Sequence, residues 1–411
     1  MLFNIAIVII KPYENKTKNL LQKNIYLSQN FYSDRILKKI CNKKELGLML
    51  IFGSILLLAI IPSSVVGIVW GQITTTPLVS TRDHFNLTTG NLLPEHNSTS
   101  YDPSDNIPGL DRQCEGEVAI YVHGVWTTAD FPSFPYFEDA IEIFDRARMS
   151  LADLNYEIPL IGFSWDSDTP ISSAGWETAK IIAKKNGPKL AEFIYDLKEK
   201  CPNTAIRLIA HSMGARVVLS SLDSLTNNLN WNNNNYTIAS VHLMGAAVDD
   251  EEVSKNSNDI VNDPTNDIRI KAAYGNGIEK EVVRFYNLYN PEDDVLEGDI
   301  ECALLSCQPI YYPQYEHDLA LGQSGAQLGI NFPENYGQIN AISQIDFIID
   351  ADGDGFCDLF IPFTAICTIY GAGDNHFGYV GFRYPFSGPF VGTLRDNGAM
   401  NIVVDNWNNP P

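Results

Sequence analysis

The sequence predicts an α/β domain with a mostly parallel central sheet and helices on both faces. From about Cys114 onward, short apolar runs typical of buried strands alternate with longer segments of helical periodicity. This order is expected when parallel strands are joined by crossover helices. The chain has 411 residues, 45% of them hydrophobic, which is enough to bury a full core. We therefore expect one large domain with appendages.

The expected elements follow from the apolar runs and their spacing. Strands are expected at residues 118–122, 159–161, 205–210, 239–244 and 281–289, and helices at residues 174–200 and 215–222. The runs assigned to strands are short and apolar, as buried parallel strands are. The apolar side chains of the longer helix mostly share one face, which we expect to pack in the core. Gly187-Pro188 should kink or break this helix, because proline lacks the N–H that a helix interior requires.

The most informative motif is the pentad Ala210-His211-Ser212-Met213-Gly214, which lies between an expected strand and an expected helix. A serine on such a sharp turn is held in a strained conformation with its hydroxyl exposed. The chain folds back on itself there, so the residues two before and two after the serine must be small. Ala210 and Gly214 meet this requirement, although Ala210 departs from the usual glycine. A serine that only caps a helix is the alternative, but the preceding strand favours a nucleophile at Ser212.

Candidate acids follow the serine in the order that such a catalytic triad requires. Asp293 and Asp294 come just after the expected strand at residues 281–289. The spacing from the acid to the next apolar residues favours Asp293. Asp249 and Asp250, after the preceding strand, are a less favoured option. Because acidic loop residues are common in this chain, a solvated turn is the alternative for each of them.

The candidate base is a histidine beyond Asp293, where the chain has His317 and His376. His376 lies in a glycine-rich loop before an aromatic stretch. Such a loop lets the ring reach the serine while its other nitrogen meets the aspartate. His317 lies among charged neighbours, which is typical of a surface residue. We therefore expect His376 to be the base.

These residues make the chain resemble the α/β hydrolases, in their lipase- and esterase-like branch of uncharacterised, esterase-type hydrolases. The resemblance covers about residues 114–390. It includes the pentad with its flanks, Gly162-Phe163-Ser164-Trp165, and Leu321-Gly322-Gln323-Ser324-Gly325 after the acid. These motifs are specific for the fold and the nucleophile and indicate little about the substrate. The resemblance implies an α/β-hydrolase domain over residues 114–411.

The resemblance also implies an oxyanion hole. The segment His123-Gly124-Val125-Trp126 matches the loop that supplies one N–H of the hole, from Val125 or alternatively from Trp126. The second N–H comes from Met213, the residue after the nucleophile. His123 itself is expected to pack or cap at the end of its strand rather than to act as the base.

By the family pattern, Ser212 attacks an acyl carbon and forms an acyl-enzyme, which water then hydrolyses. A carboxylic ester, either a small molecule or a lipid, is the expected substrate, and no cofactor is expected for catalysis. The same triad also suits amide or peptide hydrolysis. No lid is recognisable, which favours an esterase over an interfacially activated lipase. A catalytically silent scaffold for binding or adhesion at the cell surface is the other interpretation, but such proteins usually lose the nucleophile or the base.

The N-terminal part predicts a membrane or export segment. Residues 46–70 are almost wholly apolar and long enough to span a bilayer about 30 Å thick. Residues 1–45 hold nine Lys or Arg and three Asp or Glu, whereas the remainder holds 19 and 47. The positive-inside rule then places residues 1–45 in the cytoplasm and the catalytic domain outside. A cleaved signal peptide after a later translation start is the alternative, so we expect either an anchored extracellular enzyme or a secreted one.

Residues 71–113 are rich in Thr, Asn, Pro, Ser and Asp and have no periodicity, which predicts a flexible stalk. Asn86, Asn97 and Asn235 each begin a glycosylation sequon. The net charge of −22 argues against nucleic acid or an anionic membrane surface as a partner.

Six cysteines follow the membrane segment, and an even number in an exported domain predicts disulfides. Cys114 and Cys201 precede two strands that the α/β-hydrolase fold places side by side, so we expect them to pair. The other expected pairs are local: Cys302 with Cys307, and Cys357 with Cys367. Free buried thiols are the alternative.

A metal site is expected at residues 350–358, an insertion in the hydrolase domain. The expected ligands are Asp350, Asp352, Asp354, Phe356 and Asp358, because alternating carboxylates suit a hard cation such as Ca²⁺. Gly355 allows the sharp turn that such loops need. The twelfth loop residue is Ile361 rather than Glu, so the loop is not a standard EF-hand. We expect Ca²⁺ to brace the loop of His376; an acidic solvent loop is the alternative.

Overall fold

The computed structural model describes residues 76–129, 138–260, 270–297, 318–345, 376–385 and 393–409. All of these belong to one compact unit, Thr75–Pro411. The basic segment at residues 1–45 and the apolar segment at residues 46–70 lie outside the described residues. Among the residues that are described, no helix combines the length and the apolar character needed to cross a membrane.

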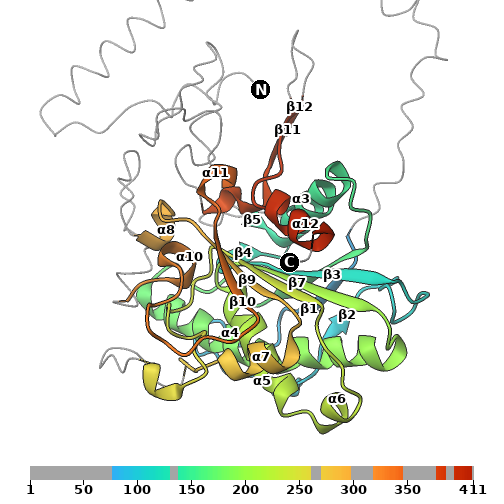
Figure 1. The fold of residues 1–411 in the computed structure, drawn as a ribbon. Helices are drawn as coiled ribbons and strands as arrows, with labels where there is room; N and C mark the ends of the chain where they lie inside the picture. The colour runs from blue at the N-terminus through green and yellow to red at the C-terminus, as the bar shows by residue number, and fades with distance from the viewer. Residues whose placement is uncertain are drawn as a thin grey trace, which may run out of the picture. The chain divides into compact units, whose positions relative to one another are not determined.

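The centre of this unit is an eight-stranded sheet, shown in Figure 1, with the order β10-β9-β8-β7-β3-β6-β1-β2. Every strand is parallel to its neighbours except β2, which pairs antiparallel with β1 at one edge. The strands are β1 (Leu78–Thr81), β2 (Asp102–Pro103), β3 (Glu117–Val122), β6 (Leu160–Trp165), β7 (Ala205–His211), β8 (Ser240–Met244), β9 (Phe285–Tyr289) and β10 (Tyr336–Asn340). The predicted mostly parallel sheet is confirmed.

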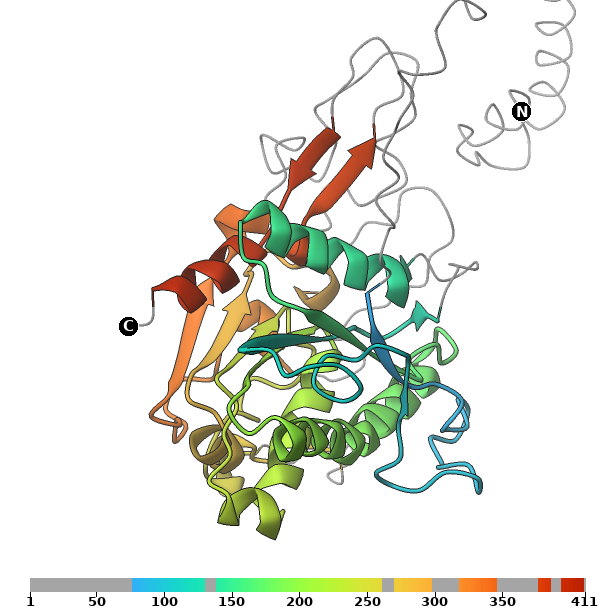
Figure 2. The same ribbon diagram turned by 90° about the vertical axis from the view of Figure 1, so that its right-hand side faces the viewer.

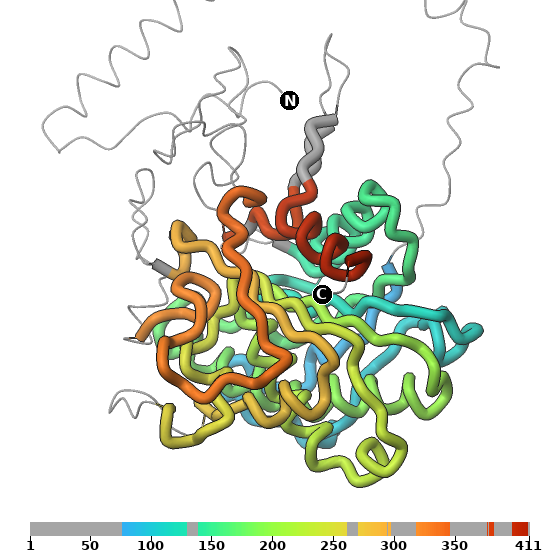
Figure 3. The backbone as a smooth tube through the Cα atoms, viewed as in Figure 1, coloured from blue at the N-terminus to red at the C-terminus, as the bar shows by residue number. Residues whose placement is uncertain are grey.

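Helices cover both faces of the sheet, as Figure 2 shows. On one face lie α4 (Ser173–Lys200), α5 (Gly214–Thr226) and α7 (Gly275–Glu281), and on the other lie α3 (Ala140–Asp153) and α12 (Met400–Asn408). The tube in Figure 3 shows that α3 and α12, far apart in the sequence, lie side by side.

The remaining elements are short. They are α6 (Leu229–Asn233), α8 (Asp294–Glu297), α10 (Leu321–Ser324), α11 (Ile342–Ile345), the 3₁₀ turns Ser257–Asp259 and Phe377–Val380, and two small sheets that pair β4 (Thr127–Thr128) with β5 (Glu138–Asp139) and β11 (Phe382–Pro385) with β12 (Thr393–Asp396).

The core lies on both sides of the sheet because side chains alternate along each strand. On β3, Val118, Ile120 and Val122 pack in the cluster under α4 and α5, while Ala119 and Tyr121 pack in the cluster under α3 and α12. Burial on both faces explains why β3 reads as a continuous apolar run instead of an alternating one.

Helix α4 continues through Pro188, so the expected break is not observed. Proline cannot donate to the carbonyl four residues earlier, which is that of Lys184. The Ser220 hydroxyl on α5 donates to this carbonyl at 2.8 Å and replaces the missing helical bond. A Cβ at Gly187 would lie 2.3 Å from the Ser220 hydroxyl, so the glycine is what lets the two helices approach.

The expectation of a flexible stalk is wrong for residues 76–113. Within this range β1 and β2 are strands of the central sheet, and Val79 on β1 is fully buried. The buried ammonium of Lys189 on α4 donates to the main-chain oxygens of Asn97 (2.6 Å) and Ser100 (2.8 Å). The segment is ordered because it adds strands to the sheet and ties its loop to α4, so the folded unit begins well before Cys114.

The predicted disulfide between Cys114 and Cys201 is present, with 5.6 Å between the two Cα atoms. These cysteines precede β3 and β7, which are neighbours in the sheet. The other predicted pairs, Cys302–Cys307 and Cys357–Cys367, lie outside the described residues.

Candidate active site

Ser212 lies on the turn between β7 and α5 with a φ of 54°, in the left-handed region that non-glycine residues rarely adopt. Close packing surrounds this turn. A Cβ at Gly214 would lie 2.6 Å from the carbonyl oxygens of Val122 and His123, and a Cβ at Gly124 would lie 2.8 Å from the Ser212 Cβ. The residue two positions after the serine must therefore be small because it contacts the end of β3 directly.

The backbone N–H groups expected at the oxyanion hole lie beside this turn. Met213 is the N-cap residue of α5. The N–H of Trp126 donates to the carbonyl of Ser167 at 2.8 Å, so this N–H is not available to an oxyanion. Of the two residues considered for the loop after β3, Val125 is therefore the better candidate.

His376 and Asp293 form a buried pair. The Nδ1 of His376 lies 2.8 Å and 3.0 Å from the two carboxylate oxygens of Asp293. Asp293 follows β9, and its Oδ1 also accepts the N–H of Leu296 at 3.1 Å, which holds it at the start of α8. A carboxylate only accepts, so the proton of this pair lies on Nδ1 and Nε2 is the basic nitrogen. Asp294 is the first residue of α8.

Ser212 and the His376–Asp293 pair lie at the same edge of the sheet. Ser212 donates its N–H to the carbonyl of Met244 at the end of β8. The next residue, Gly245, is so close to Asp293 that an added Cβ would lie 3.2 Å from its Oδ2. His211, directly before the serine, lies 2.7 Å through its Nε2 from the carbonyl oxygen of His376. The carboxyl ends of β7, β8 and β9 thus bring the three residues to one place.

His123 is structural. Its Nδ1 donates to the carbonyl of Gly124 at 2.8 Å, and its Nε2 accepts the N–H of Trp165 at 3.1 Å. Burial and the positive charge of Arg82 hold the pKa of His123 well below 6.5, so the ring is neutral. Both ring nitrogens form hydrogen bonds with the main chain, one just after β3 and one at the end of β6, and these bonds agree with the packing role expected for this histidine.

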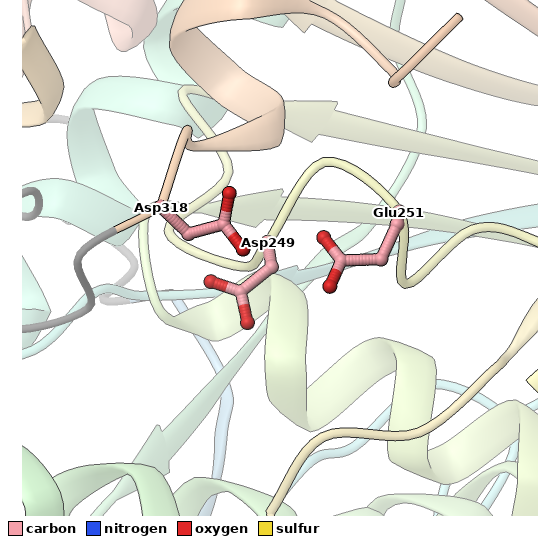
Figure 4. A group of neighbouring side chains, drawn as sticks. All are labelled: Asp249, Glu251 and Asp318. Carbon is pink, nitrogen blue, oxygen red and sulfur yellow. The ribbon is translucent and has the colours of Figure 1, made fainter. Parts of the chain in front are cut away.

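The less favoured acids Asp249 and Asp250 are buried residues just after β8. Asp249 lies in a carboxylate cluster with Glu251 and Asp318, which Figure 4 shows. The ammonium of Lys271 lies 2.7 Å from Asp249, 3.4 Å from Asp318 and 3.7 Å from Glu251. Burial and the charges of Glu251 and Asp318 raise the pKa of Asp250 to about 7. Because an ammonium supplies the positive charge here, we assign no metal ion to the cluster.

The sequence analysis missed two residues that support the site through contacts with distant segments. Arg82, at the end of β1, donates to the carbonyl of Thr127 at 2.9 Å and lies 3.2 Å from the Nε2 of His123. No local pattern marks such a residue, because its role depends on contacts with the loop after β3. His211 belonged to the pentad, but only the structure shows its contact with His376.

Several predicted site residues lie outside the described residues. These are His317 and the expected metal ligands Asp350, Asp352, Asp354, Phe356 and Asp358.

The comparisons with known proteins agree with this fold. Residues 106–282 match the model of a family described as "Alpha/beta hydrolase of unknown function (DUF900)". This chain has an α/β-hydrolase fold. The match includes the loop after β3, the serine turn and the acidic residues 249–251 after β8, and it ends before the strand β9 that precedes Asp293. No curated protein matches the chain.

Solved structures similar to this chain include an acetyl xylan esterase (11% identity, TM-score 0.22), with 33% of this chain and 65% of that one covered. Another is lipase B of Aspergillus fumigatus (8% identity, TM-score 0.29), with 64% of this chain and 47% of that one covered. A third is a cutinase-like protein from Cryptococcus sp. (12% identity, TM-score 0.26), with 64% of this chain and 91% of that one covered. The chain thus spans less than two thirds of the length of the first two. At these identities and TM-scores the similarity supports no statement about the substrate.

Proposed function

We propose that the protein is a serine hydrolase that cleaves carboxylic esters with Ser212 as nucleophile, His376 as base and Asp293 as the acid that orients the base. The observation that carries this proposal is the pair of contacts between Asp293 and the His376 Nδ1, at the sheet edge where Ser212 lies on a strained turn. A nucleophile, a base and an orienting carboxylate in this arrangement are what acyl transfer requires.

The proposed reaction has two halves. The Ser212 hydroxyl attacks the acyl carbon while the His376 Nε2 takes its proton; the C–O bond to the alcohol then breaks, and the imidazolium returns the proton to the leaving alcohol. Water attacks the acyl-enzyme in the same way, with Nε2 again as base, and releases the acid and the free serine. Asp293 remains an anion throughout and stabilises the imidazolium that forms in each half.

In this mechanism the negative oxygen of the tetrahedral intermediate receives the N–H groups of Met213 and Val125. Each such donor contributes about 3–4 kcal/mol to transition-state stabilisation. The left-handed turn at Ser212 supports this role, because it places the serine beside the N-terminal end of α5, where main-chain N–H groups are available.

The proposal predicts that Ser212→Ala abolishes hydrolysis of short-chain nitrophenyl esters while the fold persists. We expect the loss to exceed about 10³-fold, because the variant retains only binding and oxyanion stabilisation. Release of nitrophenol measures turnover, and circular dichroism serves as the folding control. Turnover that is unchanged in the variant would contradict the nucleophile assignment. A parallel panel of anilides separates ester from amide preference.

We also propose that the catalytic domain is outside the cytoplasm, either anchored by residues 46–70 or secreted. The Cys114–Cys201 disulfide supports an oxidising compartment. The sequon asparagines Asn86, Asn97 and Asn235 are exposed, so glycans could be accommodated there. Protease treatment of intact cells should remove the catalytic domain if it is anchored outside, and a domain protected until the cells are lysed would contradict this location.

Calcium binding at residues 350–358 remains a proposal based on the spacing of its acidic residues. We expect chelation with EGTA to lower the melting temperature of the full chain and added Ca²⁺ to restore it. The control is a variant in which Asp350, Asp352 and Asp354 are replaced by Asn, which should not respond. A melting temperature that EGTA leaves unchanged in the native chain would contradict a bound ion.

A further inference from the structure

The side chain of His211 contacts the main chain of the proposed base. Its Nε2 lies 2.7 Å from the carbonyl oxygen of His376, and the centroids of the two rings are 4.7 Å apart. A carbonyl oxygen only accepts, so the His211 Nε2 carries a proton and donates it. Both residues are buried, with 6% and 2% of their surfaces exposed. The bond is therefore made away from competing water.

His211 is neutral in this arrangement. Burial, together with the positive charges of a protonated His376 and of Arg146, holds the pKa of His211 well below 6.5. A neutral imidazole has a single N–H, and here it lies on Nε2, because Nε2 donates to His376. The one proton of His211 is therefore committed to the backbone of its neighbour, which argues against a role as a second general acid.

Several described contacts hold His376 and the turn that follows it. Asp293 holds its ring from Nδ1, and the turn after it is held by the Ser150 hydroxyl, which donates to the carbonyl of Val380 at 3.1 Å. His211 holds the main chain of residue 376 itself. His211 is also the last residue of β7, where it pairs with Met244 on β8, and Ser212 follows it directly. The strand that carries the nucleophile therefore also carries His211.

We propose that His211 is a positioning residue that ties the backbone of the base to the strand carrying the nucleophile and so sets the distance from Ser212 to the His376 ring. The inference rests on the serine-hydrolase function proposed above. A displacement of about 1 Å between reacting groups costs up to about 10²-fold in rate. The loss of this one hydrogen bond should therefore slow chemistry without weakening binding.

The test compares variants of the full chain by their reaction with a fluorophosphonate probe, with the maximal rate constant and the half-saturating concentration measured separately. His211→Phe keeps a ring but removes the donor, and His211→Gln returns an N–H at similar reach. We expect His211→Phe to lower the maximal rate constant about 10- to 100-fold with the half-saturating concentration within about twofold. His211→Gln should recover most of the loss.

The matched control is His242→Phe, the same substitution at a buried histidine of the neighbouring strand β8. The His242 ring packs against Tyr286 and Trp407, so this variant should keep the native rate constant. A native rate constant in His211→Phe, or a Gln variant as slow as the Phe variant, overturns the proposal. A native chain that the probe does not label at Ser212 overturns the hydrolase function instead, and the positioning role with it.

If His211→Phe does not fold, nitrogen-15 NMR of the native chain decides. A His211 ring with its proton on Nε2 and coupled across the hydrogen bond to the His376 carbonyl supports the proposal. A His211 ring with its proton on Nδ1 overturns it.

Discussion

The Asp293 carboxylate performs two hydrogen-bonding tasks at once. Both of its oxygens contact the His376 Nδ1, and Oδ1 also accepts the N–H of Leu296 at the start of α8. The first task selects the tautomer of His376, and the second fixes the carboxylate to a helix end. In the proposed mechanism, a carboxylate held in this way stabilises the imidazolium that forms when His376 takes the serine proton.

Replacement of Asp293 by Asn should therefore lower kcat for nitrophenyl ester hydrolysis by about 10³- to 10⁴-fold, because an amide no longer enforces the productive tautomer. Asp294→Asn is the matched control, since it makes the same change one residue along the chain. We expect it to keep kcat within about twofold of the native value. If the Asp294 variant were the inactive one, the assignment of the acid would be wrong.

At the scale of elements, the serine turn is held by the packing of α5 onto the end of β3. Gly214 begins α5 against the carbonyls of Val122 and His123, and Gly124 faces the Ser212 side chain. These contacts leave no space for a methyl group. The strained φ of Ser212 persists because β7 and α5 on either side of it are both packed in the core.

Gly214→Ala should therefore reduce the free energy of unfolding by about 1–3 kcal/mol, because the added methyl group must displace main-chain atoms. Urea denaturation followed by circular dichroism measures this loss. Gly116→Ala is the matched control, since a Cβ at Gly116 would meet nothing within 4 Å. Equal stability of the two variants would show that the turn is not packed as described.

For the whole molecule, buried neutral histidines connect stability to pH. His242 on β8 is fully buried, and burial with the charges of Arg207 and Arg284 lowers its pKa to about 3. The unfolded chain binds a proton at this group below about pH 6.5, whereas the folded chain does not until about pH 3. Stability is therefore complete above pH 6.5 and is lost as the pH falls toward 3.

The contribution of His242 should be about 1.4 kcal/mol for each pH unit below 6.5. Between pH 7 and pH 5, the native chain should thus lose about 2 kcal/mol more of its free energy of unfolding than His242→Phe does. Urea denaturation at the two pH values gives the difference. The same loss in both proteins would mean that His242 is not held neutral in the fold.

Local sequence patterns predicted the five central strands β3, β6, β7, β8 and β9, the serine turn, and Asp293 and His376, which lie together in the structure. These features depend on apolar periodicity and on short motifs, both of which are visible in a single segment. The Cys114–Cys201 bond followed from the fold that those motifs imply.

The features that the sequence analysis missed depend on contacts between distant segments. Strand β1 has four residues and β2 has two, too few to show a period, so they were interpreted as part of a polar stalk. Helix α4 continues past Pro188 because Ser220 supplies the missing donor from another helix. Arg82 and His211 act through residues 41 and 165 positions away, and no local pattern encodes such partners.

The most direct test of the central claim is labelling of the full chain with a fluorophosphonate probe, followed by identification of the modified peptide by mass spectrometry. The probe reports an activated serine and requires no knowledge of the substrate. We predict modification at Ser212 that is lost in His376→Ala. A folded, disulfide-bonded protein that is not modified, or is modified at another serine, would contradict the account.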